Sequence, residues 1–115
     1  MPAGQPKLFL SERTLLSDFG DRLRAARLRR KFSVDTVAAR AGISRMTLFR
    51  AEKGEASVAL GTYLRVLEVL GLSKDLSLVA SDDELGRRLQ DLALPPRRVA
   101  KTRPAKVPTG SDAPA

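Results

Sequence analysis

The sequence contains no histidine, no cysteine and no tryptophan. Without histidine and cysteine it lacks the most common general base, the thiolate nucleophile and two of the usual kinds of metal ligand. We therefore expect neither an enzyme, nor a bound metal, nor a cofactor. The absence of cysteine also rules out a disulfide framework, which makes a reducing cytoplasm the natural compartment.

Long apolar runs are missing too, since no stretch approaches the ~20 apolar residues that a membrane-spanning helix requires. The first ten residues lack the basic region and apolar core of a secretory signal. We therefore expect no association with a membrane. The three consecutive acids at residues 82–84 suit the first turn of a helix, where the helix dipole favours negative charge, so we do not expect a metal there.

Positive charge is in excess, with 21 lysines and arginines against 13 aspartates and glutamates and a formal net charge of +8. This balance makes a polyanion the leading partner, although many proteins are basic for solubility alone. At 115 residues the chain has room for one small domain and a tail. Residues 94–115 carry five cations against one acid and few bulky apolar residues, which predicts a disordered basic tail.

The chain is organised around residues 33–54, SVDTVAARAGISRMTLFRAEKG, which we predict to form two short helices joined by a tight turn. Ser33 and Ser44 can each cap a helix by accepting a hydrogen bond from a free backbone N–H. Gly42 stands where the first helix must stop in the left-handed region, and the second helix runs over residues 45–53. The arrangement is a helix-turn-helix.

Two helices of about eight residues cannot stand alone, so flanking helices should hold the pair. We expect one from Glu12 or Ser17 to Arg30, with a core face made of Leu16, Phe19, Leu23 and Ala26. We expect another over residues 60–70, with an inward row made of Leu60, Leu64, Leu67 and Leu70. Val66 and Val69 would lie on a different face of that second helix.

Residues 18–72 resemble the Cro and phage-repressor (XRE-type) family of DNA-binding domains. The resemblance rests on FGDRLRAARLRRKFS, the AGIS turn, RMTLFRAEKG and LGTYLRVLEVLGL, in that order. It implies an all-α, five-helix lambda-repressor-like bundle and a sequence-specific transcriptional regulator, most often a repressor, on the nucleoid of a prokaryotic cell. Within the family, LGRRLQDLALPPRRV is similar to HipB-like antitoxins, which implies a HipA-like toxin kinase as partner and a self-regulated toxin–antitoxin operon.

In such a protein the second helix of the pair enters the major groove of double-stranded DNA and the first crosses the backbone. Arginine can bond two acceptors of guanine together, and methionine or threonine can contact a thymine methyl. Phe49 can either stack on sugar and bases, or tuck against the helix that ends at Arg30 or against the loop after Gly54. The expected DNA-binding residues are Ser33, Ser44, Arg45, Met46, Thr47, Phe49 and Arg50, with Arg29 and Arg30 on phosphates.

Two positions depart from the family pattern. Val34 stands where a glutamine often reaches a phosphate, which puts one backbone contact in doubt. Ala51 stands where a larger apolar residue is usual, which implies either tighter helix packing or a larger neighbour that fills the gap.

One module binds modestly, so we expect a homodimer on a pseudo-palindromic operator. We divide the chain into a flexible arm at 1–11, the helix-turn-helix domain at 12–72, a C-terminal helical segment at 73–93 and the tail at 94–115. Residues 73–81 can form a short helix or a strand, and residues 82–92 form a helix. A dimer or partner interface would use Leu76, Leu78, Leu85, Leu89 and Leu92. One alternative for these leucines is that they close the monomer core. A separate alternative, for the protein as a whole, is a nonspecific basic nucleic-acid binder.

Overall fold

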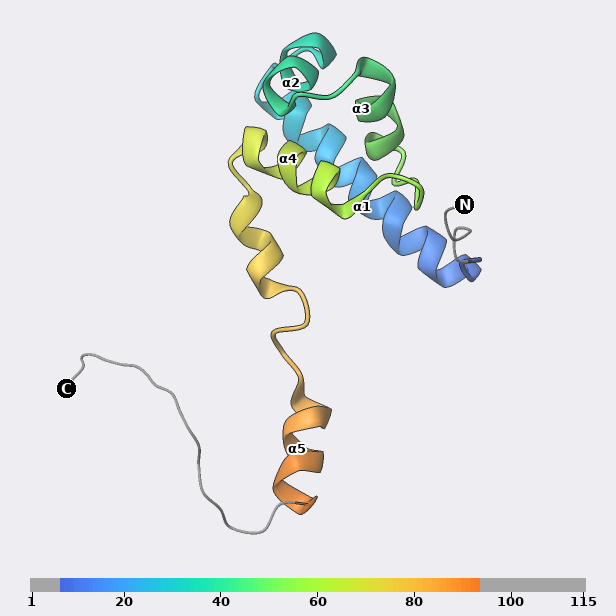
Figure 1. Ribbon diagram of the computed structural model, residues 1–115, viewed down its shortest axis with the longest axis vertical. Helices are drawn as coiled ribbons and strands as arrows, with labels where there is room; N and C mark the ends of the chain where they lie inside the picture. Colours follow the sequence, from blue (N-terminus) through green and yellow to red (C-terminus); the bar gives the residue numbers. More distant parts are fainter. Residues whose placement is uncertain (1–6, 94–115) are drawn as a thin grey trace, which may run out of the picture. The chain divides into compact units, whose positions relative to one another are not determined.

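A computed structural model describes residues 7–93 of the protein. Its elements are α1 (Leu10–Arg29), α2 (Val34–Ala41), α3 (Arg45–Glu52), α4 (Leu60–Leu70), the 3-10 helix η1 (Ser73–Leu78) and α5 (Glu84–Ala93) (Figure 1). No strand occurs within these residues, which confirms the all-α prediction. The chain divides into two compact units, the first ending at Val79 and the second beginning at Ala80. Residues 1–6 of the arm predicted at 1–11, and the whole tail predicted at 94–115, lie outside the described residues, while residues 10 and 11 of the arm belong to α1.

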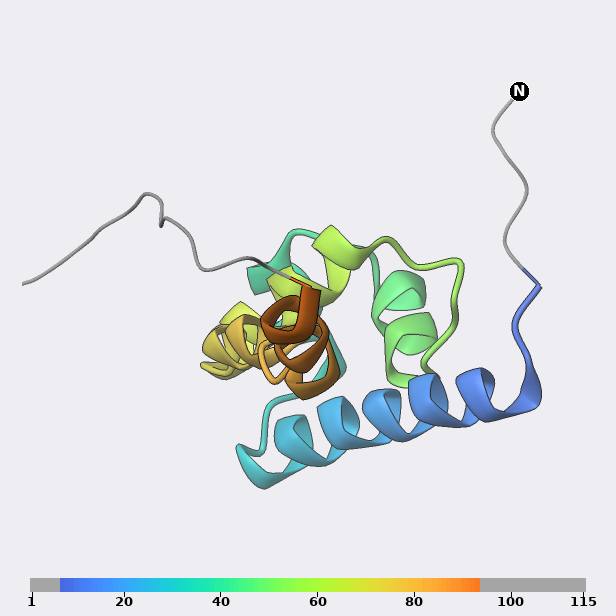
Figure 2. The same ribbon diagram turned by 90° about the horizontal axis from the view of Figure 1, so that it is seen from below.

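Helix α1 starts earlier than either start predicted from the sequence. A carboxylate oxygen of Glu12 accepts a hydrogen bond from the backbone N–H of Phe9 at 2.9 Å, which satisfies one of the free donors at the helix start. The helix therefore begins at Leu10. Figure 2 shows α1 as a long rod whose first turns extend beyond the other helices of the first unit.

The core of the first unit lies where α1, α2, α3 and α4 meet. Its buried apolar residues are Leu23, Ala26, Val37, Ala38, Ala41, Leu48, Ala51, Tyr63, Val66, Leu67 and Leu70. Leu16 and Phe19, which the sequence assigned to the core face of α1, are half-buried.

The inward face of α4 was predicted wrongly in its first half. Leu60 and Leu64 are exposed, and Tyr63 and Val66 are buried in their place. The helix is turned so that the Tyr63 hydroxyl donates to the backbone oxygen of Glu55 at 2.7 Å. The Tyr63 ring also lies 5.2 Å, centroid to centroid, from Phe19 of α1. An aromatic ring with a satisfied hydroxyl thus occupies the space that a simple leucine row would have filled.

Helices α1 and α3 approach very closely through glycine. A Cβ added to Gly20 would lie 2.5 Å from the backbone nitrogen of Gly54 and 2.6 Å from the backbone oxygen of Glu52. Gly54 has φ +71, a left-handed conformation in which a side chain is also strained. Ala51 beside them is fully buried.

A buried ion pair joins the same two helices. The Arg27 guanidinium donates to both carboxylate oxygens of Glu52, at 2.6 and 3.1 Å, and a third donor bonds the backbone oxygen of Phe32 at 3.1 Å. Both side chains are buried. The two residues are 25 positions apart in the sequence, so the pair joins α1 to α3 through the fold and not through local spacing.

Residues 73–78 form the 3-10 helix η1, which decides between the helix and the strand left open for this segment. Because η1 packs against α4, the first unit extends to Val79.

Helix α5 forms in the second unit and begins at Glu84, two residues later than predicted. The reason is local, since a side-chain oxygen of Asp83 accepts the Gly86 N–H at 2.9 Å and so caps the helix from outside. Asp82 pairs with Arg87 at 3.3 Å.

Candidate nucleic-acid interface

The pair α2–α3 is built by two serine caps and one glycine turn. The Ser33 hydroxyl accepts the Thr36 N–H at 3.0 Å, and the Ser44 hydroxyl accepts the Thr47 N–H at 3.0 Å. Gly42 between the helices has φ 72, the left-handed value that the turn requires. The predicted caps, turn and helix bounds are confirmed to within one residue.

Helix α3 has a buried side and an exposed side. Leu48, Ala51 and Glu52 face the core of the first unit. The exposed side carries the residues expected to read DNA, namely Arg45, Met46, Phe49 and Arg50. The outer surface of α3 is therefore open to a ligand in the described structure, and it carries two arginines.

Thr47 is half-buried and takes part in the cap. Its hydroxyl accepts a hydrogen bond from the Ser44 hydroxyl at 2.9 Å. Ser33 and Thr36 repeat this arrangement at the start of α2, also at 2.9 Å. The cap hydroxyls at the two helix starts are thus held in place before any ligand arrives.

Arg45 is held by a residue that the sequence analysis did not single out. Its Nε lies 2.9 Å from a carboxylate oxygen of Asp35 in the first turn of α2, with side chains 75% and 74% exposed. Because Nε makes this contact, the outer edge of the guanidinium keeps two nitrogens to offer to an acceptor. The only sequence signal for the pair is an acid in the first turn of one helix and an arginine at the start of the next.

Phe49 lies on the exposed side of α3. The Lys53 ammonium lies 4.8 Å from the centre of its ring, a cation–π contact. The ring and the ammonium together make an apolar surface with a positive edge.

The two arginines expected on phosphates lie in different surroundings. Arg30 donates to the backbone oxygen of Ala26 at 2.9 Å, so its guanidinium is partly engaged at the end of α1. Arg29 lines an apolar groove formed by α1, α4 and η1, a groove that no residue of α2 or α3 lines.

The five leucines expected at an interface lie in different units and differ in exposure. Leu76 is half-buried and lines the same groove, whereas Leu78 is exposed. The other three lie on α5 in the second unit and are exposed there.

Among residues 7–93, no group of three or more acids or other metal-binding side chains is placed to hold an ion. None of the helices in the same range is long and apolar enough to cross a bilayer.

A short, serine-capped helix with exposed arginines, seated on a second helix through a glycine turn, defines a helix-turn-helix protein of the DNA-binding class. The chain belongs to the helix-turn-helix domain family, whose model matches residues 18–78, more than half of the sequence.

The chain is also similar to a protein of Pyrococcus horikoshii, PH1808, provisionally named an HTH-type transcriptional regulatory protein. The two are 39% identical over 93 residues. The match covers 79% of this chain but 28% of the relative, so this chain spans less than a third of that protein's length.

Proposed function

We propose that the protein is a sequence-specific DNA-binding transcriptional regulator that acts as a repressor. The observation that carries the proposal is Arg45, exposed at the start of α3 and held through Nε by Asp35 of α2. An arginine fixed in this way can direct its two outer nitrogens at guanine O6 and N7, the commonest specific contact in the major groove. The name of the Pyrococcus horikoshii relative supports the regulatory role.

The residues around Arg45 make the other contacts with bases and phosphates. Arg50, one turn and a half along α3, contacts a second base or a phosphate, and Met46 packs on a thymine methyl. The first turns of α2 and α3, with their free backbone N–H groups and the hydroxyls of Ser33 and Ser44, lie at phosphates. Phosphate contacts set the register, and the contacts of α3 set the sequence.

The alternative is a basic protein that coats nucleic acid without preference. The net charge of +8 would suffice for that role. Specific reading is supported over coating because the outer face of α3 also carries Met46 and Phe49, apolar side chains that phosphates do not require.

In this proposal two copies bind a pseudo-palindromic operator, with half-sites about one helical turn apart. A single small module buries a modest area on DNA, whereas a two-fold pair doubles it and fixes the spacing of the half-sites.

A narrower form of the proposal is an antitoxin that represses its own operon beside a HipA-like toxin kinase. It is supported by the resemblance of LGRRLQDLALPPRRV alone, of which only the first part, in α5, is described. Stable co-purification with a kinase encoded next to this gene would support this form. A neighbouring gene of another kind would remove it and leave the regulator intact.

Footprinting on the DNA upstream of the protein's own gene, with selection from a random duplex pool in parallel, tests the proposed function. We expect a protected two-fold site and a loss of about 1–3 kcal/mol for each mismatched base pair in it. Equal affinity for all duplexes, with a steep dependence on salt, would establish the coating alternative instead.

A further inference from the structure

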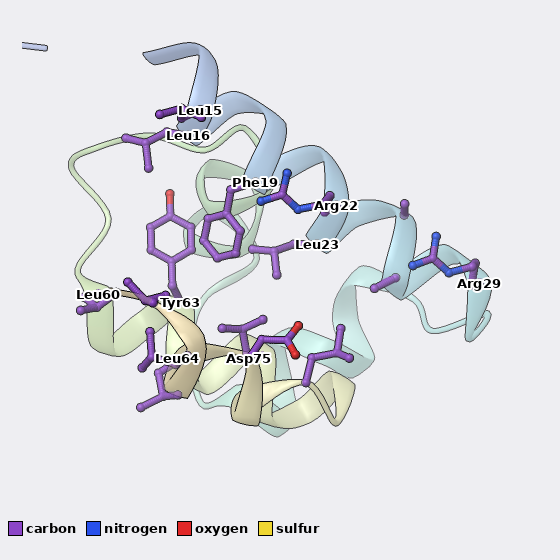
Figure 3. Close-up of a pocket in the computed structure, with 16 residues that line it drawn as sticks. Leu15, Leu16, Phe19, Arg22, Leu23, Arg29, Leu60, Tyr63, Leu64 and Asp75 are labelled. Carbon is purple, nitrogen blue, oxygen red and sulfur yellow. The ribbon is translucent and has the colours of Figure 1, made fainter. Parts of the chain in front are cut away.

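The first unit carries a long apolar groove of about 1020 Å³ between α1, α4 and η1 (Figure 3). Leu16, Phe19 and Tyr63 lie at one part of it, as the close-up shows. Leu60 and Leu64, the two leucines that α4 fails to bury, also line it. The lining of the groove is mostly apolar and includes exposed leucines, which suits a partner that presents apolar side chains.

The α1 side of the groove is basic. Arg22 and Arg29 line it two helical turns apart, with the small residues Ala25 and Ala26 between them. The Arg22 guanidinium lies 5.8 Å from the Phe19 ring. Within residues 7–93, neither arginine forms an ion pair.

Helix α5 carries an exposed row of leucines on one face. Leu85, Leu89 and Leu92 follow one another at helical spacing and are 62%, 56% and 84% exposed. At ten residues, α5 is shorter than the ~12–15 residues at which an isolated helix becomes even marginally stable. A short helix with an exposed leucine row is stabilised by a surface that covers the row.

The charges beside the leucine row match those of the groove. Glu84 and Asp91 lie two turns apart on one edge of the row, the same spacing as Arg22 and Arg29. Neither acid forms an ion pair within the described residues. Arg88 lies between the two acids, whereas Leu23, Ala25 and Ala26 line the groove between the two arginines and η1 contributes the acid Asp75. The two acids of α5 therefore match the two arginines of α1 in spacing, in either direction of the helix.

We propose that α5 of a second copy of this chain docks in the groove, its leucines on Leu60, Leu64 and Phe19 and its two acids on Arg22 and Arg29. The inference rests on the homodimer of the proposed function and names the surfaces that form it. A second copy is the occupant because reciprocal docking gives the closed two-fold pair that two half-sites need. The short connection at residues 80–83 also favours exchange of α5 between copies.

Sedimentation of the full chain without DNA measures the pair directly. Leu89→Glu should raise the dimer dissociation constant at least about tenfold, because it puts a charge in the apolar contact. Gln90→Glu adds the same charge to the opposite face of α5 and should leave the dimer dissociation constant unchanged. Leu60→Glu and Gly61→Glu repeat the comparison on α4, since Leu60 lines the groove and a side chain at Gly61 would meet nothing within 4 Å.

Two combinations identify the occupant. Arg22→Glu with Arg29→Glu should abolish the dimer, and adding Glu84→Arg with Asp91→Arg to the same chain should restore it. Mixing the Leu89→Glu chain with the Arg22→Glu, Arg29→Glu chain should give a heterodimer, because one intact α5 still meets one intact groove. Circular dichroism of each variant establishes that the helices are retained.

A monomeric wild type, or leucine variants that dimerise as tightly as their controls, would overturn the inference. So would a mixture that stays monomeric, which would place α5 in the groove of its own chain. These results do not depend on DNA. If the dimer behaves as expected but selects no duplex, the proposed function fails and the interface stands.

Discussion

Arg45, at the start of α3, lies with its Nε 2.9 Å from a carboxylate oxygen of Asp35, in the first turn of α2. Exposed ion pairs add little to stability, typically about 0.2–1 kcal/mol, because water competes for both partners. We expect the pair to act by positioning Arg45, because it links α2 to the side chain of α3 that is expected to contact a base.

Asp35→Asn should therefore affect recognition more than folding. The free energy of unfolding should change by less than about 1 kcal/mol. The preference for the selected duplex over random duplex should fall about tenfold, since the Arg45 fork loses its support, whereas the loss of one acid affects both duplexes alike. Asp82→Asn, which breaks the exposed pair with Arg87 in α5, is the matched control and should change neither quantity. An unchanged preference in Asp35→Asn would show that Asp35 does not position Arg45.

The buried pair Arg27–Glu52 should behave in the opposite way. Glu52→Gln leaves the Arg27 charge buried without its partner, and we expect a loss of about 3–5 kcal/mol in the free energy of unfolding by urea. Replacing both residues by methionine removes both charges and should recover most of the loss. A double variant no more stable than Glu52→Gln would contradict this account.

The contact between α1 and α3 predicts opposite effects of one substitution at two helical glycines. Gly20→Ala should destabilise the protein by about 1–3 kcal/mol, because the new methyl group meets the backbone of residues 52 and 54. Gly61→Ala, in α4, meets nothing within 4 Å and should stabilise it by about 0.5–1 kcal/mol through helix propensity. Thermal unfolding of the two variants and of wild type measures both changes in stability. Equal shifts in the melting temperature would be incompatible with the close approach of α1 and α3.

Tyr63 makes the stability of the fold depend on pH in the alkaline range. Burial, with a smaller contribution from the charge of Glu55, raises the pKa of Tyr63 above its ordinary value of 10.0. Above that pH the unfolded chain loses the proton first, so stability falls as the pH rises from about 10 through the pKa of the folded protein. Tyr63 is the one tyrosine in the sequence, so phenolate absorbance follows it directly. Tyr63→Phe should remove this pH step, and a step that persists would assign it to other groups.

Local signals in the sequence were sufficient for the helix-turn-helix. The Ser33 and Ser44 caps, the Gly42 turn and the spacing of small apolar residues define α2 and α3 without reference to the rest of the chain. These features act within one or two turns of helix, so they are readable from adjacent residues.

Features that depend on distant residues were not readable. The rotation of α4 follows from Tyr63 reaching Glu55 and Phe19, so the plain leucine spacing misplaced Leu60 and Leu64. Arg27 was indistinguishable from its exposed neighbours until α3 brought Glu52 to it, 25 residues away. In the candidate site the sequence supplied Arg45 but not Asp35, because an acid in the first turn of a helix already has a sufficient local explanation in the helix dipole.

The most direct test compares Arg45→Ala with wild type on the selected duplex and on random duplex at one salt concentration. We predict a loss of about 1–3 kcal/mol on the selected duplex and a much smaller loss on random duplex. Arg24→Ala, which removes one exposed arginine from α1, controls for the loss of charge. An equal loss on both duplexes, with the salt dependence reduced by about one unit, would assign Arg45 to a phosphate and contradict its role in reading sequence.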